Sequence, residues 1–253
     1  MTYDRISMMA GRMGDRLQGS RIAGLMLPRV SSCVSPWKEI EPPESWTPFE
    51  TVYQAGPFLL PSFGNGLDLE RRIDAVRVLR MLHAEGLVMA VGCCALAGSV
   101  KAGSIVVIDD HVNCTGENPL RGPNDDRLGP RYPDMSEPYD ALWTRSLERG
   151  AASMGLGVQS AVYGRIDRTV TGDELGTWEK KTGIDVVGEG LLDEVIAAVH
   201  CGLPVAAAGV VEKSWTGDGN ALCSSMPAHS EDYGRLAELI NQCLLCRGGM
   251  DDG

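Results

Sequence analysis

The chain has 253 residues, of which 43% are hydrophobic and 23% are charged, and its formal net charge is −11. This length is typical of one large α/β domain, whose core needs no disulfide or metal to hold it together. Because so acidic a surface repels phosphodiester backbones and anionic lipids, we expect no nucleic-acid partner and no membrane partner. The chain has no run of about 18 apolar residues, so no transmembrane helix is expected.

The first half of the chain is predicted to hold several strands and one helix. Residues 1–20 are polar and contain several glycines, so we expect them to be partly flexible. Short apolar runs predict buried strands, and apolar residues at helical spacing predict a helix that ends at Gly86. The predicted strands are 21–27, two short runs within 48–60, 87–92 and 104–110, and the predicted helix is 67–86.

The second half alternates helices and strands after a long polar segment, 111–139. A segment of that length without regular structure is usually functional or lies at an interface. The predicted helices are 138–155, 173–183, 191–202 and 230–249, and the predicted strands are 158–166, 185–188 and 204–212. This alternation predicts one α/β domain over residues 1–253, with a central sheet flanked by helices.

The eight cysteines are expected to be reduced and buried, as in a cytoplasmic protein. Cys243 and Cys246 form a C-x-x-C pair inside an apolar helical pattern. Because no second pair or histidine lies near them in sequence, we expect them to pack in the core. We therefore expect no metal site and no other cofactor.

Two segments carry a resemblance to a known family. DHVNCTGENPLRGPNDDRLGPRYPDMSEPYD (110–140) and GIDVVGEGLLDEVIAAVHCGLPV (183–205) resemble the trimeric branch of the purine nucleoside phosphorylase and methylthioadenosine phosphorylase family. The resemblance implies one α/β domain with a mixed, twisted sheet wrapped by helices. It also implies a small-molecule substrate, a purine nucleoside whose C–N glycosidic bond is cleaved, and a homotrimer with each active site near a subunit boundary.

The positions that bind phosphate in the family are changed in this chain. The first predicted strand continues into LMLPRVSS, which lacks the family's glycine–serine loop. Phosphate-binding loops need backbone N–H groups at close approach, and proline has none to offer. No arginine lies between Val30 and Glu70, where the family places one, and Gly190 replaces a hydroxyl side chain.

The positions that bind the purine are changed as well. Val91 stands in the place of the family's asparagine and is followed by Gly92 and Cys93. The family's phenylalanine–glutamate pair aligns with Val170 and Thr171, and its threonine–asparagine pair aligns with Glu212 and Lys213. The resemblance thus makes these positions substrate-binding candidates, with a charged Glu212 where the family has a neutral side chain.

Other family positions keep a functional side chain. The resemblance places Tyr132 in the sugar pocket of a neighbouring subunit and His229 near the 5′ end of the ribose. Glu189 replaces a methionine beneath the ribose, where a carboxylate can bind hydroxyl groups or act as a base. Glu189, Lys213 and His229 are the predicted catalytic residues.

Each candidate also has a purely structural interpretation. A carboxylate at Glu189 would stabilise the N-terminus of the following helix, and Lys213 would be an exposed loop cation. Tyr132 would pack between subunits, and His229 would cap a helix. Cys93 is unlike a nucleophile, because the sequence places no base or cation beside it.

Three functions stay open at this point. The first is cleavage of the glycosidic bond of a purine-nucleoside-like molecule. The second is a repurposed enzyme in which Glu189 and Lys213 act as acid and base in a cyclisation, isomerisation or elimination of a specialised metabolite. The third is a non-catalytic binding subunit.

Overall fold

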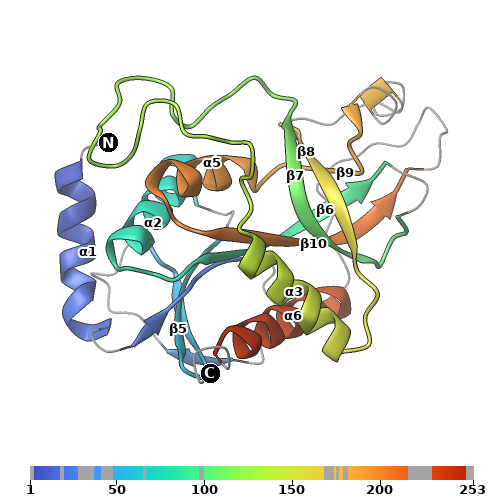
Figure 1. Cartoon of the computed structure of the whole chain (residues 1–253), viewed down its shortest axis with the longest axis horizontal. Coiled ribbons are helices and arrows are strands. Elements are labelled where there is room, and N and C mark those ends of the chain that lie inside the picture. Colours follow the sequence, from blue (N-terminus) through green and yellow to red (C-terminus); the bar gives the residue numbers. More distant parts are fainter. Residues whose placement is uncertain are drawn as a thin grey trace.

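A computed structural model describes residues 3–17, 20–27, 37–40, 48–64, 67–96, 100–167, 174, 177–178, 182–215 and 230–248. These residues form one α/β domain with a mixed sheet between helices (Figure 1), which confirms the predicted fold class. The strands are β1 (Arg21–Ile22), β2 (Gly24–Leu27), β3 (Lys38–Ile40), β4 (Thr51–Ala55), β5 (Phe58–Gly64), β6 (Leu87–Ala95), β7 (Ile105–Asn113), β8 (Gln159–Arg165), β9 (Val186–Gly188) and β10 (Val205–Ser214). The helices are α1 (Tyr3–Leu17), α2 (Leu69–Met81), α3 (Ala141–Ser153), α5 (Leu192–Cys201) and α6 (Ser230–Gly248).

Part of the sheet closes on itself as a small barrel. β6 pairs with β10, β10 with β7, β7 with β8, β8 with β9, and β9 returns to β6. The closing pair is short, because it joins only Cys94 to Val187 and Ala95 to Val186. Beyond the barrel, the sheet continues from β6 through β2, β5 and β4 to β3.

Helices cover both faces of the sheet. α3 and α6 lie side by side on one face, whereas α2 and α5 lie on the other, with α1 outside α2 (Figure 1). Each face buries its own hydrophobic cluster; Trp143 of α3 and Leu239 of α6 belong to one, and Val76 of α2 belongs to the other. The uninterrupted apolar run of β6 is therefore buried on both sides, as its sequence predicted. Among the described residues, no helix is both long and apolar enough to cross a bilayer.

The N-terminal segment contains a helix that the sequence did not predict. α1 buries Ile6, Met9, Met13 and Leu17 in the core cluster that also contains α2. Their spacing of three or four residues is that of one helix face. Two glycines in the same stretch, Gly11 and Gly14, weaken this signal, because glycine is a poor helix former.

Several predicted boundaries also need correction. α2 ends at Met81 rather than near Gly86, and His83 takes the left-handed backbone conformation (φ 57°) that glycine usually supplies at a helix end. Gly86 instead leaves room for the ring of Trp143, whose Cε2 would lie 2.5 Å from a Cβ at this position. β6 runs on to Ala95, so that Cys93 lies in a strand and not in a loop. Most of the predicted helix 173–183 lies outside the described residues.

The cysteines follow the prediction only in part. Cys93 and Cys243 are free and buried, as predicted, and Cys243 packs in the cluster that contains α3 and α6. Cys114, Cys201 and Cys246 are free but only half-buried, so Cys246 does not pack in the core as predicted. Cys94 is disulfide-bonded rather than reduced.

Candidate functional site

The candidate site lies where β6 changes its partner in the sheet. Along one edge, β6 pairs with β2 from Leu87 to Met89 and with β9 only from Cys94 onward. Between these two pairings the strands diverge, and Val91 and Gly92 lie in the gap. Open α/β sheets bind their ligands at such a point, beyond the carboxyl ends of the strands.

Glu212 is presented at this point by an irregularity in β10. Val211 pairs with Cys93 and Lys213 pairs with Cys94, so Glu212 is an extra residue without a partner on β6. A bulge of this kind redirects one side chain, and bulges are common next to active sites. Glu212 and Lys213 are both half-buried.

The Glu212 carboxylate is held by Tyr233, from the first turns of α6. The Tyr233 hydroxyl donates a hydrogen bond of 2.7 Å to Glu212 Oε1. Both groups lie against Gly92, where a Cβ would be 2.3 Å from Glu212 Oε1 and 2.6 Å from the Tyr233 hydroxyl. Only glycine therefore permits this carboxylate–phenol pair beside β6. The prediction included Gly92 and Glu212 but missed Tyr233.

A second close approach brings β9 to the same place. A Cβ on Gly188 would lie 2.3 Å from the hydroxyl of Tyr163 and 2.9 Å from the carbonyl oxygen of Gly92. The Tyr163 hydroxyl accepts a hydrogen bond of 3.3 Å from the backbone N–H of Gly190. Burial raises the pKa of Tyr163 well above its usual value, so its hydroxyl stays protonated. The prediction missed Tyr163, which only its position in a strand could have indicated.

A strained turn follows β9. Leu191 has φ 80° and ψ −56°, and the backbone N–H of Leu192 donates a 3.0 Å hydrogen bond to the carbonyl of Gly190. This is a γ-turn with positive φ, which is rare and strained in a residue with a side chain. The Leu191 side chain is fully buried and so holds the turn in place. Strain of this kind is concentrated at functional sites, and here it positions the exposed Glu189 and the half-buried Gly190 just before α5.

Two of the predicted residues are buried rather than open to a ligand. Val91 is 5% exposed and Cys93 is 3% exposed, and both belong to the same core cluster. The Cys93 thiol donates to the carbonyl of Val210 at 3.3 Å. Burial, and secondarily the charge of Glu212, raises the pKa of this thiol, so it stays protonated and is not a nucleophile. Val170, Thr171 and His229 lie outside the described residues, and their roles stay predictions.

Tyr132 lies in a different place, on the long loop between β7 and α3. Its side chain is 85% exposed, and it lines a cavity of about 530 Å³ together with Asn113, Met135 and Leu192. The guanidinium of Arg131 stacks 5.7 Å from the Tyr132 ring and donates hydrogen bonds to the carbonyls of Leu120 and Gly122. Arg131 therefore ties two parts of this loop together.

The start of the loop is anchored by two side chains at the end of β7. His111 Nδ1 lies 3.2 Å from the Tyr139 hydroxyl, and Asn113 donates to the carbonyl of Glu117 at 2.7 Å. Arg165 of β8 then links the loop to α5. It donates to the hydroxyl of Thr115 at 3.0 Å and forms a buried ion pair of 2.8 Å with Asp193.

The long loop is also held by His200. Its Nε2 lies 3.2 Å from Asn124 Oδ1, and the residue is only 3% exposed. No group of three or more metal-ligating side chains occurs within the described ranges. The site therefore consists of carboxylates, phenols and backbone groups.

Comparison with known proteins defines the class to which this fold belongs. A sequence model of the phosphorylase superfamily matches residues 34–240, and the chain belongs to this superfamily. The similar curated proteins are purine nucleoside phosphorylases, which confirms the resemblance seen in the sequence. Purine nucleoside phosphorylase 1 of Bacillus subtilis is 32% identical over 169 residues, which cover 62% of this chain and 61% of that protein. The bovine (Bos taurus) enzyme is 38% identical over 139 residues, 51% of this chain and 47% of that protein. The chain thus spans about half to three fifths of the length of these relatives.

Solved structures show the same fold. The crystal structure of Schistosoma mansoni purine nucleoside phosphorylase with a monocyclic inhibitor matches with a TM-score of 0.78 at 20% identity, covering 96% of both chains. A schistosoma purine nucleoside phosphorylase in complex with hypoxanthine matches with a TM-score of 0.77 at 22% identity, covering 96% of this chain and 95% of that one. At these identities the likeness establishes the architecture.

Proposed function

We propose that the chain is an enzyme that cleaves the C–N glycosidic bond of a purine-nucleoside-like small molecule. The proposal rests on one observation, the Glu212–Tyr233 pair held against Gly92 where β6 leaves β2 for β9. The similarity to purine nucleoside phosphorylases supports the same reaction class.

The arrangement suits recognition of a leaving purine. In the reaction, the bond between C1′ of the sugar and a ring nitrogen of the base breaks, and the base leaves with the bonding electrons and takes up a proton. The new bond to C1′ forms from an oxygen of phosphate or of water. A carboxylate oriented by a phenol accepts a hydrogen bond from an N–H of the base, and in its protonated form it donates one. We assign that role to Glu212.

A change of acceptor is the finer part of the proposal. Because no arginine lies between Val30 and Glu70, the chain lacks the bidentate cation expected there for phosphate. Glu189 and Glu212 add negative charge beside the strand ends. These features favour a second candidate function, acid–base chemistry on a less polar metabolite with Glu189 and Lys213 as the reacting pair.

Base release from a panel of purine nucleosides, with and without phosphate, tests the first function. Release that requires phosphate means phosphorolysis, and release without it means hydrolysis. Glu212→Gln should lower the rate, whereas Glu231→Gln, an exposed glutamate of α6, serves as the matched control. No release from any nucleoside contradicts the first function.

A ligand that copurifies with the protein tests the second function. Native mass spectrometry identifies the ligand, and its conversion is then followed in Glu189→Gln and Lys213→Ala. Loss of turnover in both supports the acid–base pair, and unchanged turnover in both contradicts it. A folded protein that binds the ligand without converting it is a non-catalytic subunit, the third possibility.

The assembly and location remain part of the proposal. We propose a homotrimer in the cytoplasm, in which the exposed Tyr132 contacts a neighbouring subunit. Substitution of Tyr132 by Ser, followed by native mass spectrometry, tests this contact. An assembly that stays trimeric with unchanged kinetics in the variant contradicts a role for Tyr132 at the boundary.

A further inference from the structure

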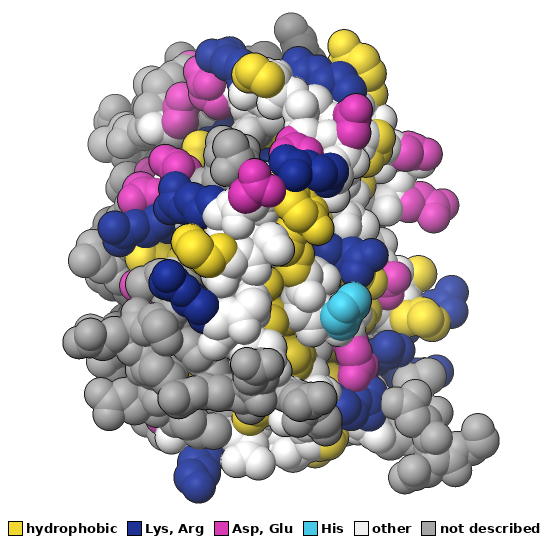
Figure 2. Space-filling model, turned by 90° about the vertical axis from the view of Figure 1, so that its left-hand side faces the viewer, with side chains coloured by type: hydrophobic (Ala, Val, Ile, Leu, Met, Phe, Trp, Pro, Cys, Tyr) yellow, Lys and Arg dark blue, Asp and Glu magenta, His cyan; other side chains and the backbone are white. Residues whose placement is uncertain are grey.

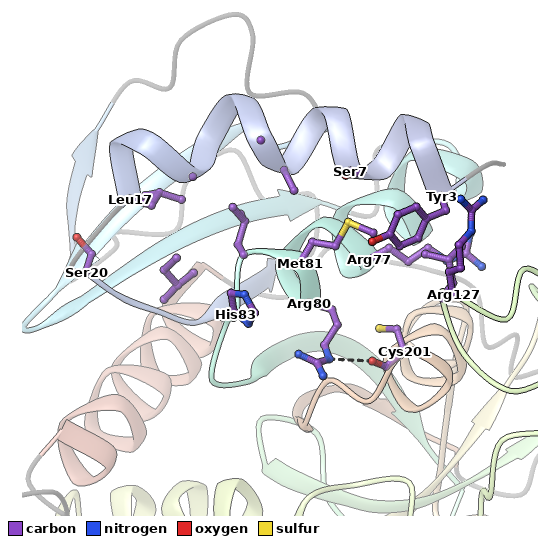
Figure 3. Close-up of a pocket in the computed structure, with 16 residues that line it drawn as sticks. Tyr3, Ser7, Leu17, Ser20, Arg77, Arg80, Met81, His83, Arg127 and Cys201 are labelled. Carbon is purple, nitrogen blue, oxygen red and sulfur yellow. Dashed lines mark hydrogen bonds between the residues drawn. The ribbon is translucent and has the colours of Figure 1, made fainter.

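A second cavity, of about 760 Å³, opens between α1 and the C-terminal end of α2. It shares no residue with the candidate site at the ends of β6 and β10. Figure 3 shows Tyr3, Arg77 and Arg127 at one end of the cavity, Leu17 and Ser20 at the other, and Met81 between them. The volume suits a small organic molecule.

The cavity wall carries basic side chains and no described acidic one. Arg77, Arg80 and His83 come from α2 and the turn after it, and Arg127 comes from the long loop. Figure 2, which views the molecule from the side of α1, shows basic and acidic side chains together over this face. The cavity wall itself is therefore more basic than the surface around it, which favours an anion over a cation.

The basic side chains differ in what already binds them. Arg127 is held by Asp125 at 2.7 Å and by Asp4 at 3.2 Å, and Arg80 donates to the carbonyl of Cys201 at 2.9 Å. Arg77 forms no hydrogen bond or ion pair with the described residues, although Asp74 lies close enough to interact with its charge.

Arg77 is therefore an uncommitted cation at the cavity wall. Its Nε is buried without a hydrogen-bond partner, and burial lowers the pKa of the guanidinium. Because Arg77 lines the cavity, an anion bound there would pair with the charge of its guanidinium.

Two glycines of α1 keep the rest of the cavity open. Gly11 and Gly14 both line it, and a Cβ on either would meet nothing within 4 Å. Glycine in the middle of a helix lowers helix stability relative to alanine. Neither glycine is required by a positive φ or by a close neighbour. What the two glycines change in the structure is the open space beside α1.

We propose that this cavity binds a small organic anion, with its phosphate or carboxylate group at Arg77 and its apolar body along the glycine face of α1. The anionic group meets the guanidinium fork of Arg77, with Arg127 beside it. The apolar part lies between Met81 and the helix, toward Leu17.

Isothermal titration of the whole chain with four probes tests the proposal. Phenyl phosphate and benzoate carry the two anionic groups on an apolar ring, whereas inorganic phosphate lacks the ring and benzyl alcohol lacks the charge. We expect saturable binding of at least one of the first two, and the tighter of them identifies the anionic group. Equal affinity for inorganic phosphate or for benzyl alcohol, or no saturable binding of either ring anion, overturns the proposal.

Two variants locate the binding. Arg77→Met removes the anchoring charge. Gly14→Leu adds a side chain toward the cavity from a position where a Cβ meets no atom within 4 Å. Each should weaken binding about tenfold or more. The matched controls are Arg145→Met, at an exposed residue of α3, and Gly157→Leu, where a Cβ meets no atom within 4 Å. Both should leave the affinity within about twofold. Binding that survives both Arg77→Met and Gly14→Leu places the anion elsewhere and overturns the proposal. Circular dichroism of each variant confirms that it is folded.

Discussion

Glu212 and Tyr233 lie on different elements, yet their side chains form a hydrogen bond of 2.7 Å. Glu212 belongs to the bulge of β10, and Tyr233 belongs to the beginning of α6. A phenol that donates to one oxygen of a carboxylate helps to fix the orientation of the whole carboxylate group. The bond thus couples the position of α6 to the chemistry at the strand ends.

Tyr233→Phe should lower activity without unfolding the protein. The variant removes one hydroxyl and keeps the ring, so Glu212 loses its orientation while the packing of α6 is preserved. We expect kcat/KM on the accepted substrate to fall by about one to two orders of magnitude. This is less than the roughly two to four orders typical of a general acid–base group, because Tyr233 acts only through Glu212. Tyr53→Phe, on β4, is the control. Full activity in Tyr233→Phe would show that the pair is structural.

Gly92→Ala should have a stronger effect on the same site. The added Cβ would lie 2.3 Å from Glu212 Oε1, so the carboxylate has to move away from β6. Gly157→Ala adds the same methyl group where nothing lies within 4 Å. Steady-state kinetics should show loss of turnover in Gly92→Ala only, and equal activity of the two variants would contradict the proposed position of the site.

Arg165→Met should destabilise the fold and loosen the long loop. It leaves Asp193, which is 3% exposed, as an unpaired buried carboxylate, and it removes the hydrogen bond to Thr115. The expected loss in the free energy of unfolding is about 3–5 kcal/mol in urea denaturation. Arg121→Met, which breaks an exposed pair with Glu117, should cost no more than about 1 kcal/mol. Adding Asp193→Leu to Arg165→Met should recover part of the loss, because no buried charge is then left unpaired.

Asp74→Asn should change the dependence of stability on pH. Asp74 is fully buried, and burial raises its pKa to about 6 despite the opposing charges of Arg5 and Arg77. Between the unfolded value of 3.8 and about 6, the native state binds more protons than the unfolded state, so this group lowers stability as pH rises. The side chain in Asp74→Asn does not titrate, so this fall in stability with rising pH is absent from the variant.

The measurement is the difference in unfolding free energy between Asp74→Asn and the unchanged chain. The difference should shift in favour of the variant by on the order of 2 kcal/mol from pH 4 to pH 6.5 and then level off. Asp109→Asn, at an exposed position, should show no such trend. A difference that is constant with pH would show that Asp74 titrates alike in both states.

The alternation of strands and helices could be predicted because a sheet buried on both faces requires continuous apolar runs in its strands and one apolar face on each helix. The apolar run from Leu87 to Val91 and the helical spacing of Ile73, Val76 and Leu79 depend only on neighbours along the chain. α1 was missed because Gly11 and Gly14 interrupt its buried apolar residues, and only the packing against α2 outweighs the low helix propensity of glycine.

The site could be predicted in part, for a similar reason. Gly190 follows β9, and Gly92 and Glu212 are the last residues of the strands predicted at 87–92 and 204–212, so all three could be located from the sequence. Tyr233 could not be identified, because its hydroxyl reaches Glu212 only through the angle at which α6 packs on the sheet. The γ-turn at Leu191 could not be predicted either, because leucine rarely adopts a positive φ. Burial of the Leu191 side chain holds its backbone in this conformation.

The closure of the barrel has a consequence for how copies of this chain can meet. β10 is paired on both sides, by β6 and β7, so the described part of the sheet ends at β3. β3 is three residues long and exposes Lys38 and Glu39, a combination that discourages the addition of a further strand. Any assembly of subunits therefore has to be built from loops and helix surfaces, and a change in those surfaces can alter the oligomer without disturbing the sheet that carries the site.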